Sequence, residues 1–116
     1  MRKTLEQERA SFCIERVRNI TSDEKKYKYK SNAKDLPSFI VSNGLIPALA
    51  FYKSKEDRKP VYNTINEWLK KRGIIQNDAL DELTTKKNFK DLRLATVEAL
   101  AIANWLKRIV EVEIGD

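Results

Sequence analysis

The sequence predicts an all-α fold, a compact bundle of about five to six helices around a long C-terminal helix. Glycine and proline occur only three times each, while Leu, Ala, Glu, Lys and Arg dominate. These dominant residues lose little conformational freedom on entering a helix. Apolar residues recur three or four positions apart in several segments, as the buried face of a helix requires. The length of 116 residues suits one hydrophobic core, so we expect a single helical domain over residues 1–116.

The first helix is expected over residues 4–20. Thr4 and Gln7 have the spacing of a capping box, in which each side chain bonds the backbone of the other residue. The apolar residues that follow fall on one helical face. They are Ala10, Cys13, Ile14, Val17 and Ile20.

The next segment, residues 22–43, is expected to contain two helical pieces. Thr21, Ser22 and Asp23 are cap-type residues, and the lysine-rich run KKYKYKSNAKD after them is expected to form an exposed helix. Pro37 disfavours helical geometry at Leu36 but suits a first helical turn. A separate, short, buried helix is therefore expected to start at Pro37.

The triplet of Ser42, Asn43 and Gly44 interrupts the most hydrophobic local run, LPSFIVSNGLIPALAFY. A catalytic role for Ser42 would require a group that activates its hydroxyl, and the chain has no histidine. Asn and Gly readily adopt the left-handed backbone that closes a helix. We therefore expect a joint at Gly44, followed by a new helix that runs to about Ser54.

Three more helices are expected in the second half of the chain. Pro60 is expected to start a helix that Gly73 ends, and Asn77 to cap a short helix followed by a TTKK loop over residues 84–87. Asn88 marks the start of the last helix, which is expected to run from Phe89 to about Val112. Its stretch ALAIANWL is apolar around nearly the whole circumference, so this helix is expected to be central.

Composition and charge narrow the range of partners. The chain has 23 Lys and Arg against 17 Asp and Glu, a net charge of +6, and a pI of about 9.5. This surplus favours binding to polyanions such as nucleic acid or anionic lipid. Its one cysteine, Cys13, excludes an internal disulfide and fits a reducing cytoplasm. Neither a signal peptide nor an apolar run of about 20 residues is present, so no membrane contact is expected.

No pattern for catalysis, cofactor binding or metal binding emerges. The absence of histidine, of a Gly-rich phosphate loop and of a cysteine pair excludes the usual nucleophile, dinucleotide and zinc sites. Asp78, Asp81 and Glu82 would suit a divalent ion, but acidic residues in a first helical turn usually complement the helix dipole. We expect no enzyme activity, no cofactor, no metal and no small-molecule substrate.

Residues 68–83 are also compatible with a helix-turn-helix that binds DNA. The second helix would carry Asp78, Asp81 and Glu82 toward the phosphates, so the charges argue against this interpretation. Tyr27 and Tyr29 lie among lysines, but their spacing of two puts them on different helical faces, which weakens a base-stacking role. Trp68 and Trp105 lie on apolar stripes and are expected in the core.

Several stretches resemble the small helical subunit of the type III-B CRISPR effector, the Cmr complex. They are Arg9-Ala10, LPSFIVSNGLIPALAFY at 36–52, Trp68-Leu69, and LRLATVEALAIANWLKR at 92–108. The resemblance covers residues 4–110, and the sequence departs from the family at Leu92, where tyrosine is frequent. It implies a compact all-α protein without nuclease activity. It also implies that copies stack head to tail beside the backbone subunits that hold the guide RNA.

The positive charge and the resemblance together predict contact with RNA. We expect sequence-independent binding to the backbone of guide and target RNA, with other faces on copies of the chain and on other Cmr subunits. The residues expected to bind RNA are Arg9, Lys25, Lys26, Lys70, Lys71, Arg93, Lys107 and Arg108. The alternative is a protein-binding adaptor unrelated to RNA, in which the cations keep the chain soluble or meet an acidic partner.

Overall fold

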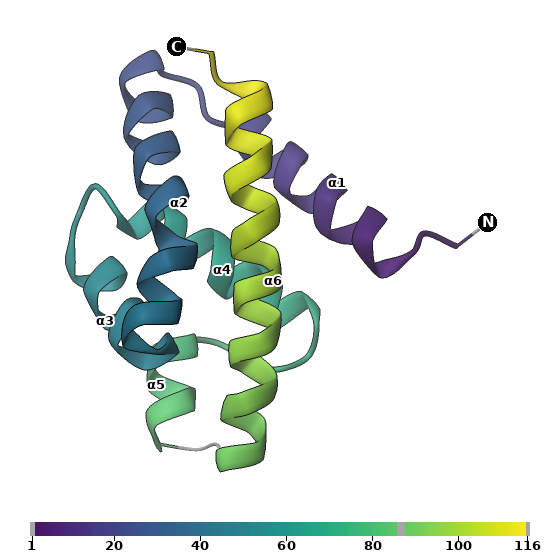
Figure 1. Ribbon diagram of the computed structural model, residues 1–116, viewed down its shortest axis with the longest axis vertical. Coiled ribbons are helices and arrows are strands. Elements are labelled where there is room, and N and C mark those ends of the chain that lie inside the picture. Colours follow the sequence, from purple (N-terminus) through teal and green to yellow (C-terminus); the bar gives the residue numbers. More distant parts are fainter. Residues whose placement is uncertain (1, 86–87, 116) are drawn as a thin grey trace.

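The computed structural model describes residues 2–85 and 88–115, and these residues form six helices and no strand. The all-α prediction is confirmed (Figure 1). The helices are α1 (Leu5–Arg18), α2 (Asp23–Asn43), α3 (Leu45–Ser54), α4 (Lys59–Lys71), α5 (Ala79–Thr85) and α6 (Phe89–Glu113). None of these helices is long and apolar enough to cross a membrane.

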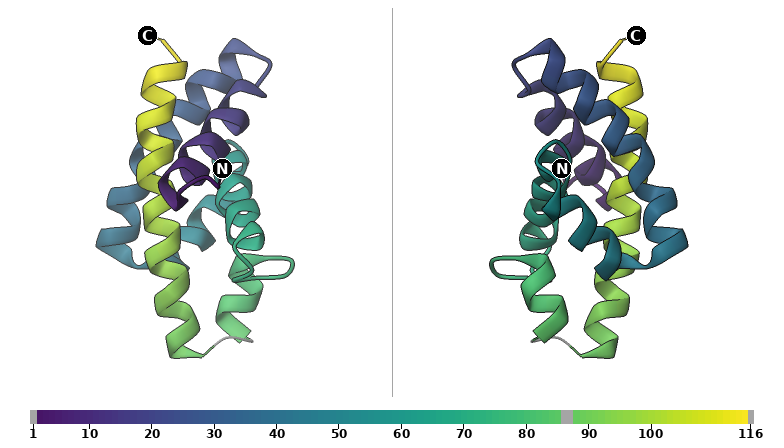
Figure 2. Two further views of the ribbon diagram at one scale, coloured as in Figure 1. Left: turned by 90° about the vertical axis from the view of Figure 1, so that its right-hand side faces the viewer. Right: turned by 90° about the vertical axis from the view of Figure 1, so that its left-hand side faces the viewer.

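The two longest helices, α2 and α6, lie side by side and run in opposite directions along the longest axis of the molecule (Figure 1). At 1.5 Å per residue, the 25 residues of α6 span about 37 Å. Helix α1 crosses the C-terminal half of α6, and α4 packs against α6 from behind (Figures 1 and 2). The expected central position of the last helix is confirmed, although one side of α6 stays exposed.

The core lies between α6 and the helices α1, α2 and α4, with α3 packed against α2 and α4. Trp68, Ile65 and Leu69 of α4 are fully buried, as are Ile102 and Leu106 of α6. These residues recur three or four positions apart on each helix, so they share one helical face that is buried from solvent. The burial of Trp68 confirms its predicted core position.

The predicted core position of Cys13 on α1 is also confirmed, since its side chain is fully buried. Burial in apolar surroundings raises the pKa of the Cys13 thiol to about 12. The thiol is therefore protonated at neutral pH and behaves as a small apolar group. It is no candidate for a nucleophile.

The helix starts confirm the predictions from cap residues. Thr4 and Gln7 form both bonds of a capping box at α1, and the Ser22 side chain accepts a hydrogen bond from the Lys25 N–H at α2. The Asn88 side chain accepts a hydrogen bond from the Asp91 N–H at the start of α6. Each cap satisfies a backbone N–H that has no partner within the helix.

One prediction about α2 is wrong, because no separate helix starts at Pro37. Helix α2 continues through Pro37 to Asn43. Leu36, Pro37 and Ile40 are all buried, and this burial offsets the hydrogen bond that a proline removes inside a helix. The first half of α2 is also less exposed than expected, because Tyr29 and Asn32 are buried while Tyr27 faces solvent.

The predicted joint between helices is confirmed at Gly44. This residue ends α2, starts α3, and has φ +88°, a region that L side chains rarely adopt. A Cβ at this position would lie 3.8 Å from Pro47 Cδ, an ordinary contact. The backbone conformation, and not lack of space, therefore requires glycine here.

Three smaller details of the second half differ from expectation. The Asp81 N–H donates to the Asp78 carboxylate, so Asp78, and not Asn77, supplies the side-chain cap of α5. Thr84 and Thr85 belong to α5 and not to a loop. The two lysines of that predicted loop, residues 86 and 87, lie outside the described residues. Trp105 is only half-buried, because it lies at the edge of the interface between α1 and α6.

Candidate functional site

A buried hydrogen-bonded group occupies the contact between α1, α4 and α6. Arg9 donates to both oxygens of the Glu98 carboxylate, at 3.0 Å to Oε1 and 2.9 Å to Oε2. The indole Nε1–H of Trp68 donates to Glu98 Oε1 at 2.8 Å. The Arg9 and Glu98 side chains are only 16% and 8% exposed. This geometry makes Arg9 a partner of Glu98 inside the protein and leaves it little surface for a ligand.

The charge of Glu98 is maintained by these neighbours. Burial alone raises the pKa of the Glu98 carboxyl. The hydrogen bonds from Arg9 and Trp68, and the positive charges of Arg9 and Arg72, lower this pKa by a larger amount. The net result is a pKa below the usual 4.5. The group therefore holds three helices together as an ion pair at neutral pH. We find no geometry here for acid–base chemistry.

The carboxylates near α5 also have structural partners. Glu82 is buried and accepts hydrogen bonds from the backbone N–H groups of Gln76, Asn77 and Asp78. Asp78 accepts from the Tyr62 hydroxyl at 2.6 Å and from Lys53 at 2.9 Å. Within the described part of the chain, no group of three or more side chains is arranged to hold a metal ion. These acidic residues fix the start of α5.

The hydroxyl of Ser42 makes no hydrogen bond to any described residue, and Ser42 lies exposed at the end of α2. The triplet at residues 42–44 is therefore a helix end. The Asn43 side chain donates to the Phe39 carbonyl in the preceding turn, which supports the same interpretation.

The remaining residues expected to bind RNA differ in their surroundings. Lys70 forms a loose ion pair with Glu67, at 3.6 Å, on the exposed side of α4. The ammonium group of Lys71 lies 5.9 Å from the centre of the Phe12 ring. The other five form no ion pair with any residue that the structure describes. They are Lys25, Lys26, Arg93, Lys107 and Arg108.

These cations do not gather in one patch. Lys25 lines a hollow between the α1–α2 turn and α4, while Lys26 lines a small hollow beside the C-terminal end of α6. Arg93 borders a groove at the other end of α6, and Arg108 lines a hollow between α1 and α6 together with Glu6 and Trp105. These four cations therefore lie at separate places on the described surface and not along one stripe.

Exposed apolar side chains are a feature that the sequence analysis did not predict. The large apolar residues that stand out from the described surface are Tyr27, Val41, Phe89, Leu94, Val97 and Val112. Tyr27 and Val112 lie where α2 begins and α6 ends, at one end of the molecule (Figure 1). The other four lie where α2 ends and α6 begins, at the opposite end.

The apolar group at the start of α6 surrounds a groove. Phe89, Leu92 and Val97 line it from α6, and Ile46 and Pro47 line it from α3. Phe89 is 76% exposed, an unusual position for a large aromatic side chain. Apolar surface rimmed by charge, here Arg93, is typical of a protein contact. The sequence contained little indication that these residues are exposed, because their spacing continues the apolar pattern of the buried face of the helix.

Comparison with known proteins identifies the family. The family model described as CRISPR-associated protein (Cas_Cmr5) matches residues 5–113. The chain belongs to the Cmr5 family. A relative from Thermotoga maritima named CRISPR system Cmr subunit Cmr5 is 33% identical, and the alignment covers 97% of this chain and 87% of the relative. A protein of the same name from Thermus thermophilus is 31% identical, with coverage of 94% and 95%.

Membership of the Cmr5 family confirms the resemblance found from the sequence. The match includes the motifs at 36–52 and 92–108 that carried that resemblance. In the structure these motifs form the second half of α2 with α3, and most of α6. Both motifs supply core residues, but α6 also carries Glu98, Arg93 and Arg108. The family signature thus combines residues of the core with residues of the surface.

Proposed function

We propose that this chain is the small, non-catalytic subunit of an RNA-guided type III-B CRISPR effector that acts in the cytoplasm. The match to the Cmr5 family over residues 5–113 carries this proposal, together with two relatives named as Cmr subunits. The partners are other Cmr subunits, further copies of the chain, and the guide and target RNA. Cleavage of the target belongs to neighbouring subunits.

Copies of the chain stack head to tail in this proposal. The arrangement of exposed apolar residues supports it, because Tyr27 and Val112 lie at one end of the molecule and Phe89 and Val97 at the other. A contact between two different patches can repeat without closing, which produces an open filament. We assign the groove beside Phe89 to a second copy, whose opposite end, around Val112, covers it.

The RNA contacts in this proposal are made to phosphates and not to bases. The lysines and arginines of the set are spread over α2, α4 and α6, and those of α2 and α6 form no ion pair with any described residue. This spread suits a strand that passes several copies. The proposed contacts are Lys25, Lys26, Lys70, Lys71, Arg93, Lys107 and Arg108. Arg9 is left out of this set because its guanidinium already bonds Glu98.

Charge reversal in the assembled effector tests the RNA contacts. Changing Lys107→Glu together with Arg108→Glu should weaken retention of target RNA and reduce the slope of affinity against salt by roughly 0.7 for each phosphate that the variant no longer neutralises. Lys34→Glu with Lys55→Glu, two exposed lysines outside the proposed set, is the control. If neither the first variant nor equivalent paired reversals from the set change the retention of target RNA or its salt dependence, the chain has no RNA role.

Co-purification separates this proposal from the alternative of an RNA-independent adaptor. When a tagged chain is expressed in its native host and purified, we expect large CRISPR subunits and guide RNA to co-purify with it. Recovery of a discrete heterodimer without RNA would favour the adaptor and contradict the proposal. Nuclease treatment before elution shows whether protein contacts alone hold the chain in the assembly.

A further inference from the structure

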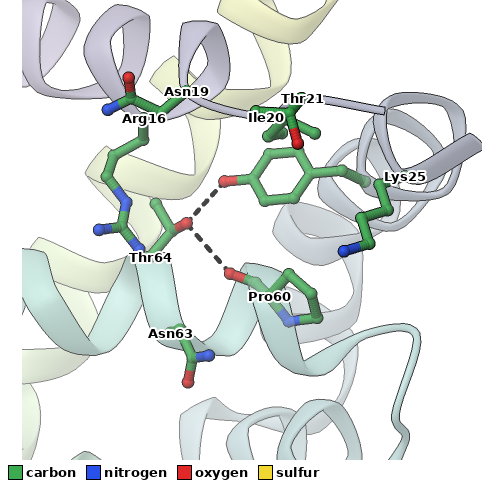
Figure 3. Close-up of a pocket in the computed structure, with 9 residues that line it drawn as sticks. Arg16, Asn19, Ile20, Thr21, Lys25, Pro60, Asn63 and Thr64 are labelled. Atoms are coloured by element: carbon green, nitrogen blue, oxygen red, sulfur yellow. Dashed lines mark hydrogen bonds between the residues drawn. The ribbon is translucent and has the colours of Figure 1, made fainter. Parts of the chain in front are cut away.

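A hollow of about 380 Å³ opens between the α1–α2 turn and the first turns of α4 (Figure 3). This volume is within the range of roughly 300–1,000 Å³ that is usual for small ligands. Three helices and one turn contribute to the walls. The lining residues are Arg16, Asn19, Ile20, Thr21, Lys25, Tyr29, Pro60, Asn63 and Thr64.

Two cations from different helices line this hollow. Figure 3 shows Arg16 of α1 and Lys25 of α2 on opposite sides of the hydrogen bond between Tyr29 and Thr64. Neither cation forms an ion pair with any residue in the described ranges. Other arginines of α1 do have partners, since Arg9 bonds Glu98 and Arg18 bonds Glu113. Within the described residues, Arg16 and Lys25 thus line the same hollow, and no carboxylate is paired with either charge.

The floor of the hollow is rigid and already satisfied. The Tyr29 hydroxyl and Thr64 Oγ1 lie 2.6 Å apart, and Thr64 Oγ1 donates to the Pro60 carbonyl at 3.1 Å. Tyr29 and Thr64 are both buried. The positive charge of Arg16 also acts on the Tyr29 hydroxyl, where it partly opposes the rise in pKa that burial causes. The floor therefore fixes the shape of the hollow, and the cations remain free to bind a ligand.

The chemistry of the lining selects an anion. None of the nine lining residues is acidic, and the two asparagines add amide donors to the two cations. Helix α4 points its N-terminal end here, with no acidic residue in its first turn and no side-chain cap, so its dipole adds positive potential. An arginine fork with a second cation opposite matches the oxygens of a phosphate.

A neighbouring hollow provides a contrast. It shares Lys25, Tyr29 and Pro60 with the first hollow, but it is lined by Glu24, Glu56 and Asp57. These three carboxylates would repel a phosphate. The preference for an anion is therefore restricted to the side of Lys25 that faces Arg16.

We propose that this hollow binds a phosphate group, held between the Arg16 guanidinium and the Lys25 ammonium. The inference deepens the proposed function and rests on it, because a phosphodiester of the RNA strand is the phosphate that the assembled effector would supply. It adds Arg16 to the contact residues. A free phosphate monoester has the same chemistry, and the experiment below distinguishes these two sources.

The test is a titration of the isotope-labelled full chain followed by amide chemical shifts. The probes are a short single-stranded RNA of mixed sequence and, separately, inorganic phosphate. We expect RNA to move the amide signals of Thr21, Asn63 and Thr64. Arg16→Gln should weaken the apparent affinity roughly tenfold, as expected for loss of a charge-assisted hydrogen bond.

Lys34→Gln is the matched control, because Lys34 is an exposed, unpaired lysine on the same helix as Lys25 and does not line the hollow. It should change the affinity by less than about twofold. Thermal unfolding of each variant checks that the fold is retained. If Arg16→Gln unfolds the chain, the titration is repeated with Lys25→Gln, which should leave the fold intact because Lys25 is exposed.

The outcomes separate the possible ligands. Shifts with RNA that depend on Arg16 support the site with the strand as its source, and shifts with inorganic phosphate alone support a site for a small phosphate ligand. No shift with either probe, or shifts that survive Arg16→Gln, would overturn the inference. If Arg16→Gln leaves RNA retention by the assembled effector intact while the Lys107 and Arg108 reversal lowers it, this hollow is excluded and the proposed function stands.

Discussion

At the residue scale, the ion pair between Arg9 and Glu98 is the contact that the sequence did not reveal. The two residues are 89 positions apart, so no local pattern connects them. Arg9 looks like an ordinary surface cation of α1, and Glu98 like one polar residue in an apolar helix. Only the fold brings both to the Trp68 indole, where the ion pair and the hydrogen bond explain each residue type.

We predict that Glu98→Gln lowers the free energy of unfolding by roughly 3 kcal/mol at neutral pH, since it leaves the buried Arg9 charge uncompensated. The folded-state pKa of Glu98 lies below 4.5, so its charge stabilises the fold above that pH and stops doing so as the pH falls through the lowered pKa. The difference between wild type and variant should therefore shrink below about pH 4.5. Urea unfolding from neutral pH to about pH 3 measures it.

A suitable control for Glu98→Gln is Glu113→Gln, which breaks the exposed pair with Arg18. The Arg18 side chain is 68% exposed, so this change should cost under about 1 kcal/mol. A Glu98→Gln effect as small as that of the control would contradict the structural role of Arg9. A destabilisation that stays constant down to acidic pH would show that the Glu98 charge is not responsible.

At the element scale, helix ends were more predictable from the sequence than helix interiors. Thr4, Ser22, Asn88 and Gly73 were assigned correctly, because a cap depends on residues within one turn of it. The break expected at Pro37 was wrong for the opposite reason. Whether a helix continues through proline depends on how much apolar surface its next turns bury, which is decided by packing against α3 and α6.

The joint between α2 and α3 gives a prediction at this scale. Gly44→Ala should lower the free energy of unfolding by roughly 1–3 kcal/mol, because φ +88° with ψ 163° is a backbone region that essentially only glycine adopts. Gly115→Ala is the control, since no positive φ occurs there and nothing lies within 4 Å of its Cβ. Thermal or urea unfolding compares the two. Equal stability of both variants would mean that the joint relaxes into another conformation.

At the scale of the whole molecule, the sequence predicted the fold class and the family but not the surface. Periodicity indicated which helix faces are buried, and it predicted the core positions of Cys13, Ile65 and Trp68 correctly. It could not show that Arg16 of α1 and Lys25 of α2 line one hollow, or that the exposed apolar residues lie at two opposite ends of the molecule. Both features depend on how the helices are arranged in space. We propose that the hollow binds phosphate and that the two apolar ends bind further copies of the chain.

Stacking through two different ends is the central claim about how this protein assembles. Phe89→Glu places a charge on the apolar surface at one end of the molecule, and Val112→Glu does so at the other. Both residues are more than 75% exposed, so each variant should keep the wild-type fold. Wild type at high concentration should form a ladder of oligomers in sedimentation velocity. Either variant alone should stay monomeric, because every contact needs one intact copy of each end.

Mixing the two variants is the most direct measurement of this claim. The intact Val112 end of the Phe89→Glu chain should meet the intact Phe89 end of the Val112→Glu chain, and growth should then stop. We predict a one-to-one dimer in the mixture and no larger species. A mixture that remains monomeric, or a single variant that still forms dimers or ladders, would contradict head-to-tail stacking through these two ends.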